Sequence, residues 1–339
     1  MQDSIIASIV VCHHVGNLIE GCLKSLKYQL TLDEKLLSNT ETIVVTSTGR
    51  SFDECITIHE PALPATKRNI GVSIAKGRYI IFLDDDVELD DKAIAYLIAS
   101  LDYHPDYGMA YGKLYNMEHR TKLDEAGGFL TWTGFIWSRA GQNIVDEGQY
   151  DTARGRLTPI FSGKSALCIV RKDLYTRLGG MDESFGILGE ESDLSWRIWK
   201  AGYKVGFTSE AYGYHAFNTK YKPVKKHYTL ERVHHNGCRN YLMMLVKNLE
   251  VNKLWILLVN ATVWFIVACV MAFTGKPRAA FHILSALWYV LIHLPTLLRK
   301  RGINQVTSDR DIEPFIWHSP PRGYYLQRFT RYLSVRLHG

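Results

Sequence analysis

The 339-residue sequence lacks the features of several common protein classes. It has only 10 prolines and no low-complexity tract, which excludes collagen-like and wholly disordered chains. Its 6 cysteines are dispersed and form no CxxC pair, so neither a zinc site nor a disulfide framework is expected. This cysteine usage favours a reducing compartment. Since 47% of the residues are hydrophobic and 22% are charged, much of the chain must fold around an apolar core.

Positive charge is concentrated near the end of the sequence. Residues 247–339 contain 12 lysines and arginines against 4 acidic residues, whereas residues 1–246 contain 28 against 30. A mildly acidic body argues against a nucleic-acid partner. The basic C-terminal part predicts a localised contact with an anionic membrane surface.

Three apolar runs predict β-strands, and a helix-compatible stretch follows each of them. The runs are continuous rather than alternating, which indicates strands covered on both faces and a mostly parallel sheet flanked by helices. In such an α/β fold, ligands bind beyond the carboxyl ends of the strands, so residues 12–15, 46–50 and 84–86 should converge there. The predicted strands are 5–11, 41–47 and 79–83, and the predicted helices are 18–28, 65–76 and 90–101.

Residues 116–163 are rich in glycine and tryptophan and show no clean periodicity, which predicts a functional loop region. The pattern then resumes with a strand over 165–171, a helix over 191–201 and a short strand over 203–207.

Two uncharged segments of 20 residues follow, 254–273 and 279–298. Each could reach about 30 Å, the thickness of a bilayer core. Lys276 and Arg278 in the intervening turn oppose its translocation, so a hairpin lying in the membrane plane competes with two crossings. Two buried helices of a soluble domain are a further alternative. One helical face of the second segment suits packing on protein or at an interface; it carries His282, Ser285, Tyr289 and His293.

The last part of the sequence, 321–339, predicts a basic amphipathic helix on a membrane surface. It has no acidic residue, and aromatic residues separate its four arginines: Arg322, Arg328, Arg331 and Arg336.

Asp84, Asp85 and Asp86 directly follow the apolar strand 79–83. Adjacent carboxylates repel one another unless a cation is present, so a cluster at a strand end is a candidate site for a divalent metal. The alternative is an acidic loop that caps the helix beginning near Asp90.

A second acidic group lies at the start of a predicted helix, where Glu190, Glu191 and Asp193 follow a glycine-rich turn. Favourable interaction with the helix dipole explains one or two acids there, but three also supply a general base. Lys67 and Arg68 begin another helix, where positive charge is unfavourable unless an anion such as a diphosphate binds. Ordinary surface charge is the alternative for this pair.

These motifs occur in the order found in the inverting glycosyltransferases of family 2, which have the GT-A fold, and residues 4–217 resemble that family. A softer resemblance connects the hydrophobic segments and basic tail to its membrane-associated, rhamnosyltransferase-like members. The matching segments are KRNIG at 67–71, GRYIIFLDDD at 77–86, GGMDESF at 179–185, EESDLSWR at 190–197 and the histidine at 215.

The resemblance implies a role for each matching residue. Asp84 and Asp86 occupy the Asp-x-Asp positions that engage the nucleotide sugar and its Mg²⁺ or Mn²⁺, and His215 matches a histidine that completes the metal shell. Glu191 matches the catalytic base. Other expected substrate contacts are Asp85, Lys67, Arg68, His13, Thr46, Glu190, Asp193, Trp132 and Trp196.

Two departures from the family pattern affect the nucleoside pocket. Residues 12–15 read CHHV instead of a PTYN-like run, and Thr46 replaces an aspartate. The identity of the base therefore stays open. Glu191 stands where aspartate is usual, which retains a base but leaves open whether Glu190 or Asp193 shares its role.

The sequence thus predicts a metal-dependent inverting glycosyltransferase that uses a nucleotide-sugar donor and a lipid-linked or polysaccharide acceptor. It would act at the cytoplasmic face of the cell membrane. Two alternatives are a polyprenyl-phosphate glycosyl synthase, which needs no hydroxyl-deprotonating base, and a non-catalytic sugar-binding or membrane-scaffolding relative. The expected domains are a catalytic domain over 1–246, a membrane-associated hairpin over 247–301 and a basic tail over 302–339.

Overall fold

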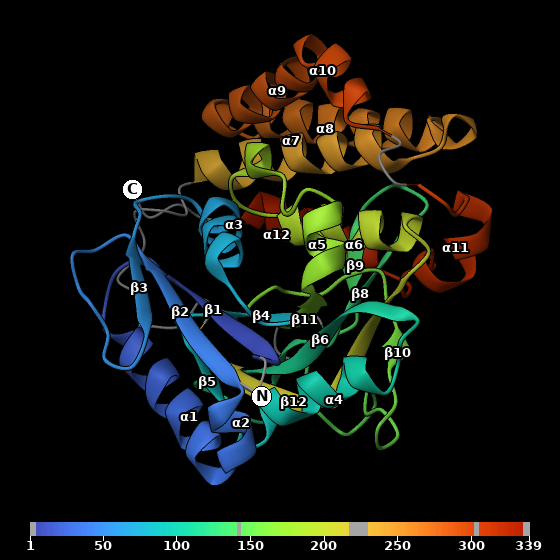
Figure 1. Cartoon of the computed structure of the whole chain (residues 1–339). Helices are drawn as coiled ribbons and strands as arrows, with labels where there is room; N and C mark the ends of the chain where they lie inside the picture. The colour runs from blue at the N-terminus through green and yellow to red at the C-terminus, as the bar shows by residue number, and fades with distance from the viewer. Residues whose placement is uncertain (1–4, 141–143, 217–229, 302–304, 335–339) are drawn as a thin grey trace. The chain divides into compact units, whose positions relative to one another are not determined.

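The computed structural model describes residues 5–140, 144–216, 230–301 and 305–334 (Figure 1). The chain forms two compact units. The first, here called the sheet unit, comprises 1–128 and 138–223, and the second, the helical unit, comprises 129–137 and 224–339. The predicted domain boundaries after residues 246 and 301 stay predictions.

A mixed sheet forms the centre of the sheet unit, with the strand order β10-β12-β6-β11-β4-β1-β2-β3. The first part is parallel, as predicted, because β1 pairs with both β2 and β4, and β2 pairs with β3. β11 runs antiparallel between β4 and β6, and β12 runs parallel to β6. The strands are β1 (Ala7–His13), β2 (Thr40–Thr46), β3 (Ile56–His59), β4 (Tyr79–Asp84), β6 (Tyr107–Asn116), β10 (Thr158–Pro159), β11 (Leu167–Arg171) and β12 (Lys204–His215).

The five predicted strands are thus confirmed as β1, β2, β4, β11 and β12, although β12 extends well beyond the predicted 203–207, whereas β3, β6 and β10 were not predicted. The segment 116–163 contains short strands in place of a wholly irregular loop. In this segment β7 pairs with β6, and β8 and β9 form a separate two-stranded sheet. Outside it, β5 follows the acidic triplet and pairs with β12. Their bounds are β5 (Val87–Leu89), β7 (Leu123–Glu125), β8 (Gly128–Leu130) and β9 (Ile136–Ser138).

Helices cover both faces of the sheet (Figure 1). On one face, Ile9 and Ile81 share an apolar core with side chains of α1 and α4. On the other face Val10 faces α3, and the packing is so close that a Cβ at Gly71 would lie 2.4 Å from Val10 Cγ1. The helices of this unit are α1 (Leu18–Leu32), α2 (Glu34–Ser38), α3 (Pro64–Ile74), α4 (Ala93–Asp102), α5 (Lys172–Arg177) and α6 (Glu190–Lys200).

The helical unit contains the two uncharged segments. The first is a single helix, and residues 251–273 form the one described helix that is long and apolar enough to cross a membrane, with a mean hydropathy of 2.4. The second segment breaks at His293 into two helices. The helices are α7 (Leu230–Asn248), α8 (Trp255–Phe273), α9 (Pro277–Ile292), α10 (Leu294–Arg299), α11 (Asp309–Ile316) and α12 (Tyr324–Ser334).

The polar face predicted for the second segment packs on α7. His235 Nδ1 lies 2.9 Å from Ser285 Oγ, and the Tyr289 ring stacks on His293 with 3.9 Å between centroids. Arg239 of α7 lies over the Tyr289 ring. This confirms that the face suits contact with protein rather than lipid on all sides.

The amphipathic helix predicted within 321–339 corresponds to α12 (Tyr324–Ser334), as far as the described residues extend. Arg328 does not project from the unit: its guanidinium lies over the Phe135 ring and donates to the hydroxyls of Tyr241 and Tyr324. Arg336 lies outside the described residues.

Candidate metal and transfer site

The carboxyl ends of β1, β2 and β4 meet at one edge of the sheet, as the sequence predicted. Cys12 pairs with Asp84 across β1 and β4, and His13 pairs with Thr46 across β1 and β2. The backbone N–H of His14 donates to Asp85 Oδ2 at 3.0 Å. Residues 12–15, 46–50 and 84–86 therefore come together at the edge where ligands bind in α/β folds.

Asp84, Asp86 and His215 form a cluster in which one potential metal-ligating atom from each lies within 4.8 Å of the others. Asp86 and His215 are buried, and Asp84 is half-buried. His215 reaches the aspartates because the end of β12 pairs with β5, directly after the acidic triplet. The N–H of Ala216 also donates to the carbonyl oxygen of Asp86 at 2.9 Å, which fixes the two segments to each other.

Asp124 completes the surroundings of His215 and was not predicted. Its Oδ2 lies 2.8 Å from His215 Nδ1, while His215 Nε2 lies 3.3 Å from Asp86 Oδ1. Lys164 forms an ion pair with Asp124 at 2.7 Å. Burial alone would lower the pKa of His215, but Asp86 and Asp124 outweigh it and raise that pKa to about 9.

This arrangement fits a divalent cation. Two carboxylates offer the oxygen ligands that Mg²⁺ and Mn²⁺ prefer, and one imidazole nitrogen faces them. A carboxylate bound to the second ring nitrogen is the usual way in which a ligating histidine is oriented, and Asp124 occupies that position.

Arg68 connects the aspartates to the second acidic group. Its side chain is buried, and its two terminal nitrogens contact Asp84 Oδ1 at 2.7 Å and Glu190 Oε1 at 3.2 Å. Burial would lower the pKa of Arg68, but Asp84 and Glu190 raise it well above its usual value. The structure thus brings the two predicted acidic motifs to one site.

Glu190 and Glu191 begin α6 after a turn with left-handed backbone. Gly186 and Gly189 have φ of 71° and 88°, and Leu188 has φ of 75°, which is unfavourable for a residue with a side chain. Burial, followed by the charge of Glu190, raises the pKa of the Glu191 carboxyl well above its usual value. A raised pKa makes a carboxylate a better acceptor of protons near neutral pH.

Lys67 is buried and not a surface charge, and the same is true of Arg68. The Lys67 ammonium donates to the carbonyl of His13 and to Ser47 Oγ at 2.6 Å, so it holds the ends of β1 and β2. The side chains of His13 and Thr46 contact each other at 2.8 Å and are buried. Their predicted contact with the nucleoside stays a prediction.

Two further residues predicted to bind substrate are buried in the sheet unit. Asp193 is 0% exposed and pairs with Arg197, which donates to the carbonyls of Leu178 and Gly180. Trp196 is also 0% exposed and packs edge-on against Phe161. Both side chains stabilise the α6 region from inside, and their predicted contact with substrate stays a prediction.

Trp132 belongs to the helical unit. Its ring stacks on Trp317 with 4.9 Å between centroids, and Lys253 Nζ lies over both rings. Trp132 keeps part of its surface exposed, and its predicted contact with an acceptor stays a prediction.

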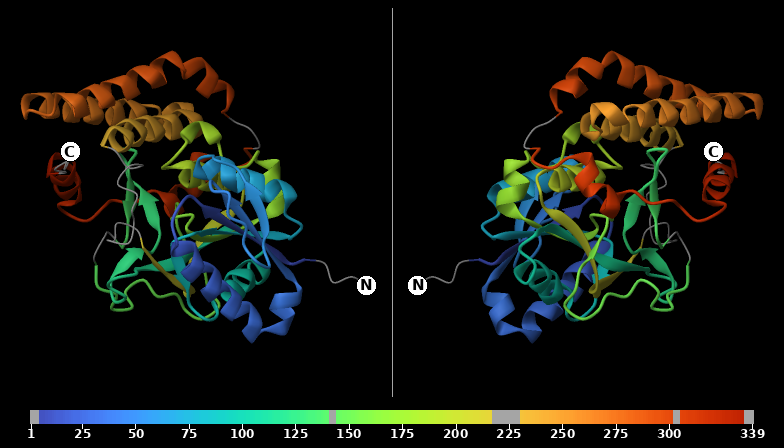
Figure 2. Two further views of the ribbon diagram at one scale, coloured as in Figure 1. Left: turned by 90° about the vertical axis from the view of Figure 1, so that its left-hand side faces the viewer. Right: turned by 90° about the vertical axis from the view of Figure 1, so that its right-hand side faces the viewer.

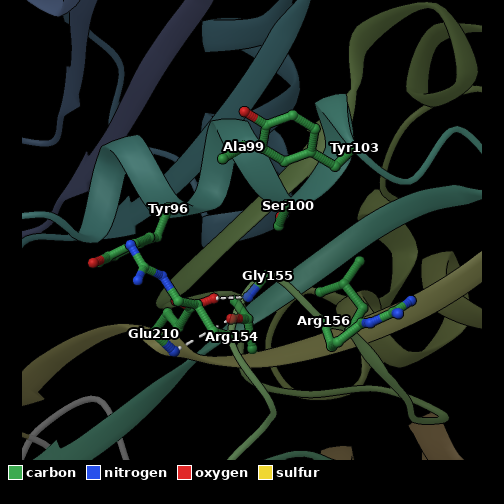
Figure 3. A pocket seen from close by; sticks show the side chains of 10 residues that line it. Tyr96, Ala99, Ser100, Tyr103, Arg154, Gly155, Arg156 and Glu210 are labelled. Atoms are coloured by element: carbon green, nitrogen blue, oxygen red, sulfur yellow. Dashed lines mark hydrogen bonds between the residues drawn. The ribbon is translucent and has the colours of Figure 1, made fainter.

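A separate hollow of about 200 Å³ lies between α4 and the loop that contains Arg154 and Arg156 (Figure 3). Tyr96 of α4 and Tyr103, which directly follows this helix, line it. It shares no residue with the aspartate and histidine cluster, so it is not part of the site described above.

Several known proteins resemble this chain. GalNAc-T7, in a crystal structure with UDP, GalNAc and Mn²⁺, matches with a TM-score of 0.56 and 14% identity over 87% of this chain and 58% of that one. Residues 1–349 of S. aureus TarS in complex with UDP match with a TM-score of 0.50 and 15% identity over 88% and 90%. These likenesses show the GT-A fold.

Sequence similarity points to the same group of enzymes. The O-antigen biosynthesis protein RfbC of Myxococcus xanthus is 29% identical over 141 residues, which are 40% of this chain and only 11% of RfbC. A family model described as glycosyl transferase family group 2 matches residues 79–299, about two thirds of the chain. The match includes the acidic triplet, the start of α6 and His215, and the chain therefore belongs to the family 2 glycosyltransferases.

Proposed function

We propose that this protein transfers a sugar from a nucleoside-diphosphate donor to a hydroxyl group and inverts the configuration at the sugar C1. The observation that carries the proposal is the cluster of Asp84, Asp86 and His215, linked by Arg68 to the helix start that bears Glu191. Family membership and the UDP complexes of the two similar structures support it.

Asp84, Asp86 and His215 would hold Mn²⁺ or Mg²⁺. Such an ion neutralises the negative charge that develops on the departing diphosphate. The imidazole ligand favours Mn²⁺, because Mg²⁺ in proteins is bound through oxygen atoms, and the GalNAc-T7 structure was determined with Mn²⁺. Asp124 keeps the His215 ring in the orientation that ligation needs.

Glu191 is the proposed general base. It would take the proton from the acceptor hydroxyl as that oxygen attacks the sugar from the face opposite the diphosphate. Its half-buried position and the neighbouring charge of Glu190 raise its pKa, which suits this role. Arg68 fixes Glu190 and Asp84 in relation to each other, and Lys67 places positive charge at the strand ends where the diphosphate would lie.

The proposed acceptor is a lipid-linked or cell-surface glycan, and the transferred group is a hexose or a deoxyhexose, as in rhamnosyltransferase-like members. The name of RfbC supports a role in polysaccharide assembly.

The proposed location is the cytoplasmic face of the cell membrane. The apolar helix 251–273 and the run Arg299-Lys300-Arg301 support it, because positive residues beside apolar helices favour that side.

The experiment is a screen of UDP, dTDP and GDP sugars with Mn²⁺ or Mg²⁺, in which the release of nucleoside diphosphate is measured. We expect release that depends on the metal and is lost in Asp86→Ala. Asp106→Ala is the matched control, because this aspartate forms an exposed ion pair with Lys204 and lies outside the site. Release that is equal with and without chelator would contradict the proposed metal site.

A further inference from the structure

One face of α8 and of α9 carries large apolar side chains that are exposed. On α8, Leu258, Phe265 and Phe273 are 68%, 53% and 91% exposed, and they follow one another at helical spacing. On α9 four exposed side chains recur every three or four residues and so share one helical face: Phe281, Leu284, Trp288 and Leu291. Together these seven residues are called the outer face.

The opposite faces of the same helices are covered within the helical unit. Trp264 of α8 contacts the Phe135 ring, and Asn260 donates to the carbonyl of Thr133 at 2.7 Å. α9 packs on α8 and on α7. α8 and α9 lie side by side (Figure 2). α7, α8 and α9 all contact one another, and the outer-face residues are exposed side chains of two of these helices.

A surface of this kind is unusual in a soluble monomer, where large contiguous apolar patches are rare and mark an interaction site. Basic residues border it: Arg278 at the start of α9 and Arg299 at the end of α10 are both exposed. Apolar side chains flanked by exposed cations match the two layers of an anionic bilayer surface, which are acyl chains and negatively charged headgroups.

Two features disagree with a pair of membrane crossings. α9 has 16 residues, about 24 Å at 1.5 Å per residue, and is shorter than a bilayer core of about 30 Å. It also packs on α7 through a polar seam that includes His235, Arg239 and Ser285. If α9 crossed the bilayer, α7 and its ionisable side chains would lie at the same depth, which is unfavourable.

We propose that α8 and α9 lie in the plane of an anionic phospholipid bilayer, with the outer face in the acyl-chain boundary and neither helix crossing. This inference rests on the membrane association proposed above and specifies its geometry. Trp288, which is 63% exposed, lies among the outer-face residues and fits the membrane interface, where tryptophan is enriched.

The first test measures depth with a fluorophore on single cysteines introduced into the full chain as Leu258→Cys, Phe265→Cys and Phe273→Cys. The chain is bound to vesicles of phosphatidylcholine and phosphatidylglycerol in equal parts, and spin-labelled lipids quench the fluorescence. The labelled parent chain gives the background from the native cysteines. We expect one shallow depth for all three positions. A deep Phe265 position between two shallow ends would show a crossing and overturn the proposal.

The second test compares Phe265→Glu with Tyr103→Glu in vesicle sedimentation. Tyr103 follows α4 in the sheet unit and is 75% exposed, so it controls for the loss of an exposed aromatic side chain. We expect Phe265→Glu to weaken binding about tenfold or more and Tyr103→Glu to leave it unchanged. Circular dichroism confirms that both variants fold.

Absence of vesicle binding by the parent chain, with a concentration-dependent dimer in light scattering, would show that a second copy covers the outer face and would overturn the lipid assignment. None of these measurements involves sugar transfer. A chain that lies in the membrane plane but releases no nucleoside diphosphate would contradict the proposed chemistry alone, and the reverse result would contradict the membrane geometry alone.

Discussion

In the sheet unit ionisable side chains are buried, whereas in the helical unit apolar side chains are exposed. Arg68, Asp86 and His215 lie inside the first unit, and Leu258 and Phe273 lie on the surface of the second. Buried charges cost free energy unless they pair with one another, and Arg68 pairs with Asp84 while His215 pairs with Asp86 and Asp124. The first arrangement surrounds the site in which we propose that a dication binds, and the second exposes apolar side chains that the proposed acyl chains would cover.

The largest expected effect distinguishes the proposed metal site of the sheet unit from the proposed membrane surface of the helical unit. Asp86→Ala removes one of three proposed metal ligands, and we expect sugar transfer to fall by about 1000-fold or more, because a metal ion contributes several kcal/mol to the transition state. Vesicle binding should stay at the parent level, since the change lies in the sheet unit. Transfer rates and vesicle sedimentation, measured on the same preparation, check both expectations. Near-parental transfer would remove Asp86 from the site.

Glu191→Gln keeps the size of the side chain and removes its basicity. We expect transfer to fall about 100-fold or more, as is typical when a general base is lost, while binding of the nucleoside diphosphate is retained. Steady-state rates and calorimetry with UDP measure the two properties. Full activity in this variant would favour a phosphate acceptor, which requires no base, and would point to a polyprenyl-phosphate glycosyl synthase.

Asp193→Ala tests whether a buried acid serves structure rather than substrate. It leaves Arg197 without its carboxylate partner, and we expect the free energy of unfolding to fall by about 3 kcal/mol. The KM for an acceptor should not change, because the side chain is 0% exposed. Urea unfolding and acceptor titrations provide the two values. A raised KM for the acceptor with parental stability would show that Asp193 contacts the acceptor.

The smallest expected effect is a shift in the pH profile. As the proposed base, Glu191 must be ionised, so activity should decline once the pH falls below its pKa, which burial and then the charge of Glu190 raise. Glu190→Gln removes that charge, lowers the pKa of Glu191 and should move the acid limb of kcat/KM to lower pH. A profile that stays in place, with Glu191→Gln still inactive, would show that Glu190 does not tune the base.

The strands and helices around the acidic motifs could be predicted because their signals are local. β4 is a continuous apolar run, and the acidic triplet follows it directly. β6 escaped prediction because its sequence, YGMAYGKLYN, has no such run. Its glycines meet neighbouring elements so closely that a Cβ at Gly108 would lie 2.4 Å from Leu174, and this requirement is set by tertiary packing.

Side-chain roles were harder to predict than backbone structure. Asp124 has no distinctive sequence context and reaches His215 only because β7 pairs with β6 beside β12. Trp196 was predicted only as a substrate contact, and nothing in the sequence indicated that it packs edge-on against Phe161. The family resemblance located the acidic motifs, but it gave no information on which neighbouring side chains are buried.

The Arg68 guanidinium has one consequence for any mutational study of the site. It is shared between Asp84 and Glu190, so the removal of either carboxylate leaves the cation entirely to the other. The losses of transfer rate caused by single substitutions at these two positions will consequently not add in the double variant. The difference between the loss in the double variant and the sum of the two single losses, each expressed as a free energy, measures how strongly the donor side and the acceptor side of the reaction are coupled.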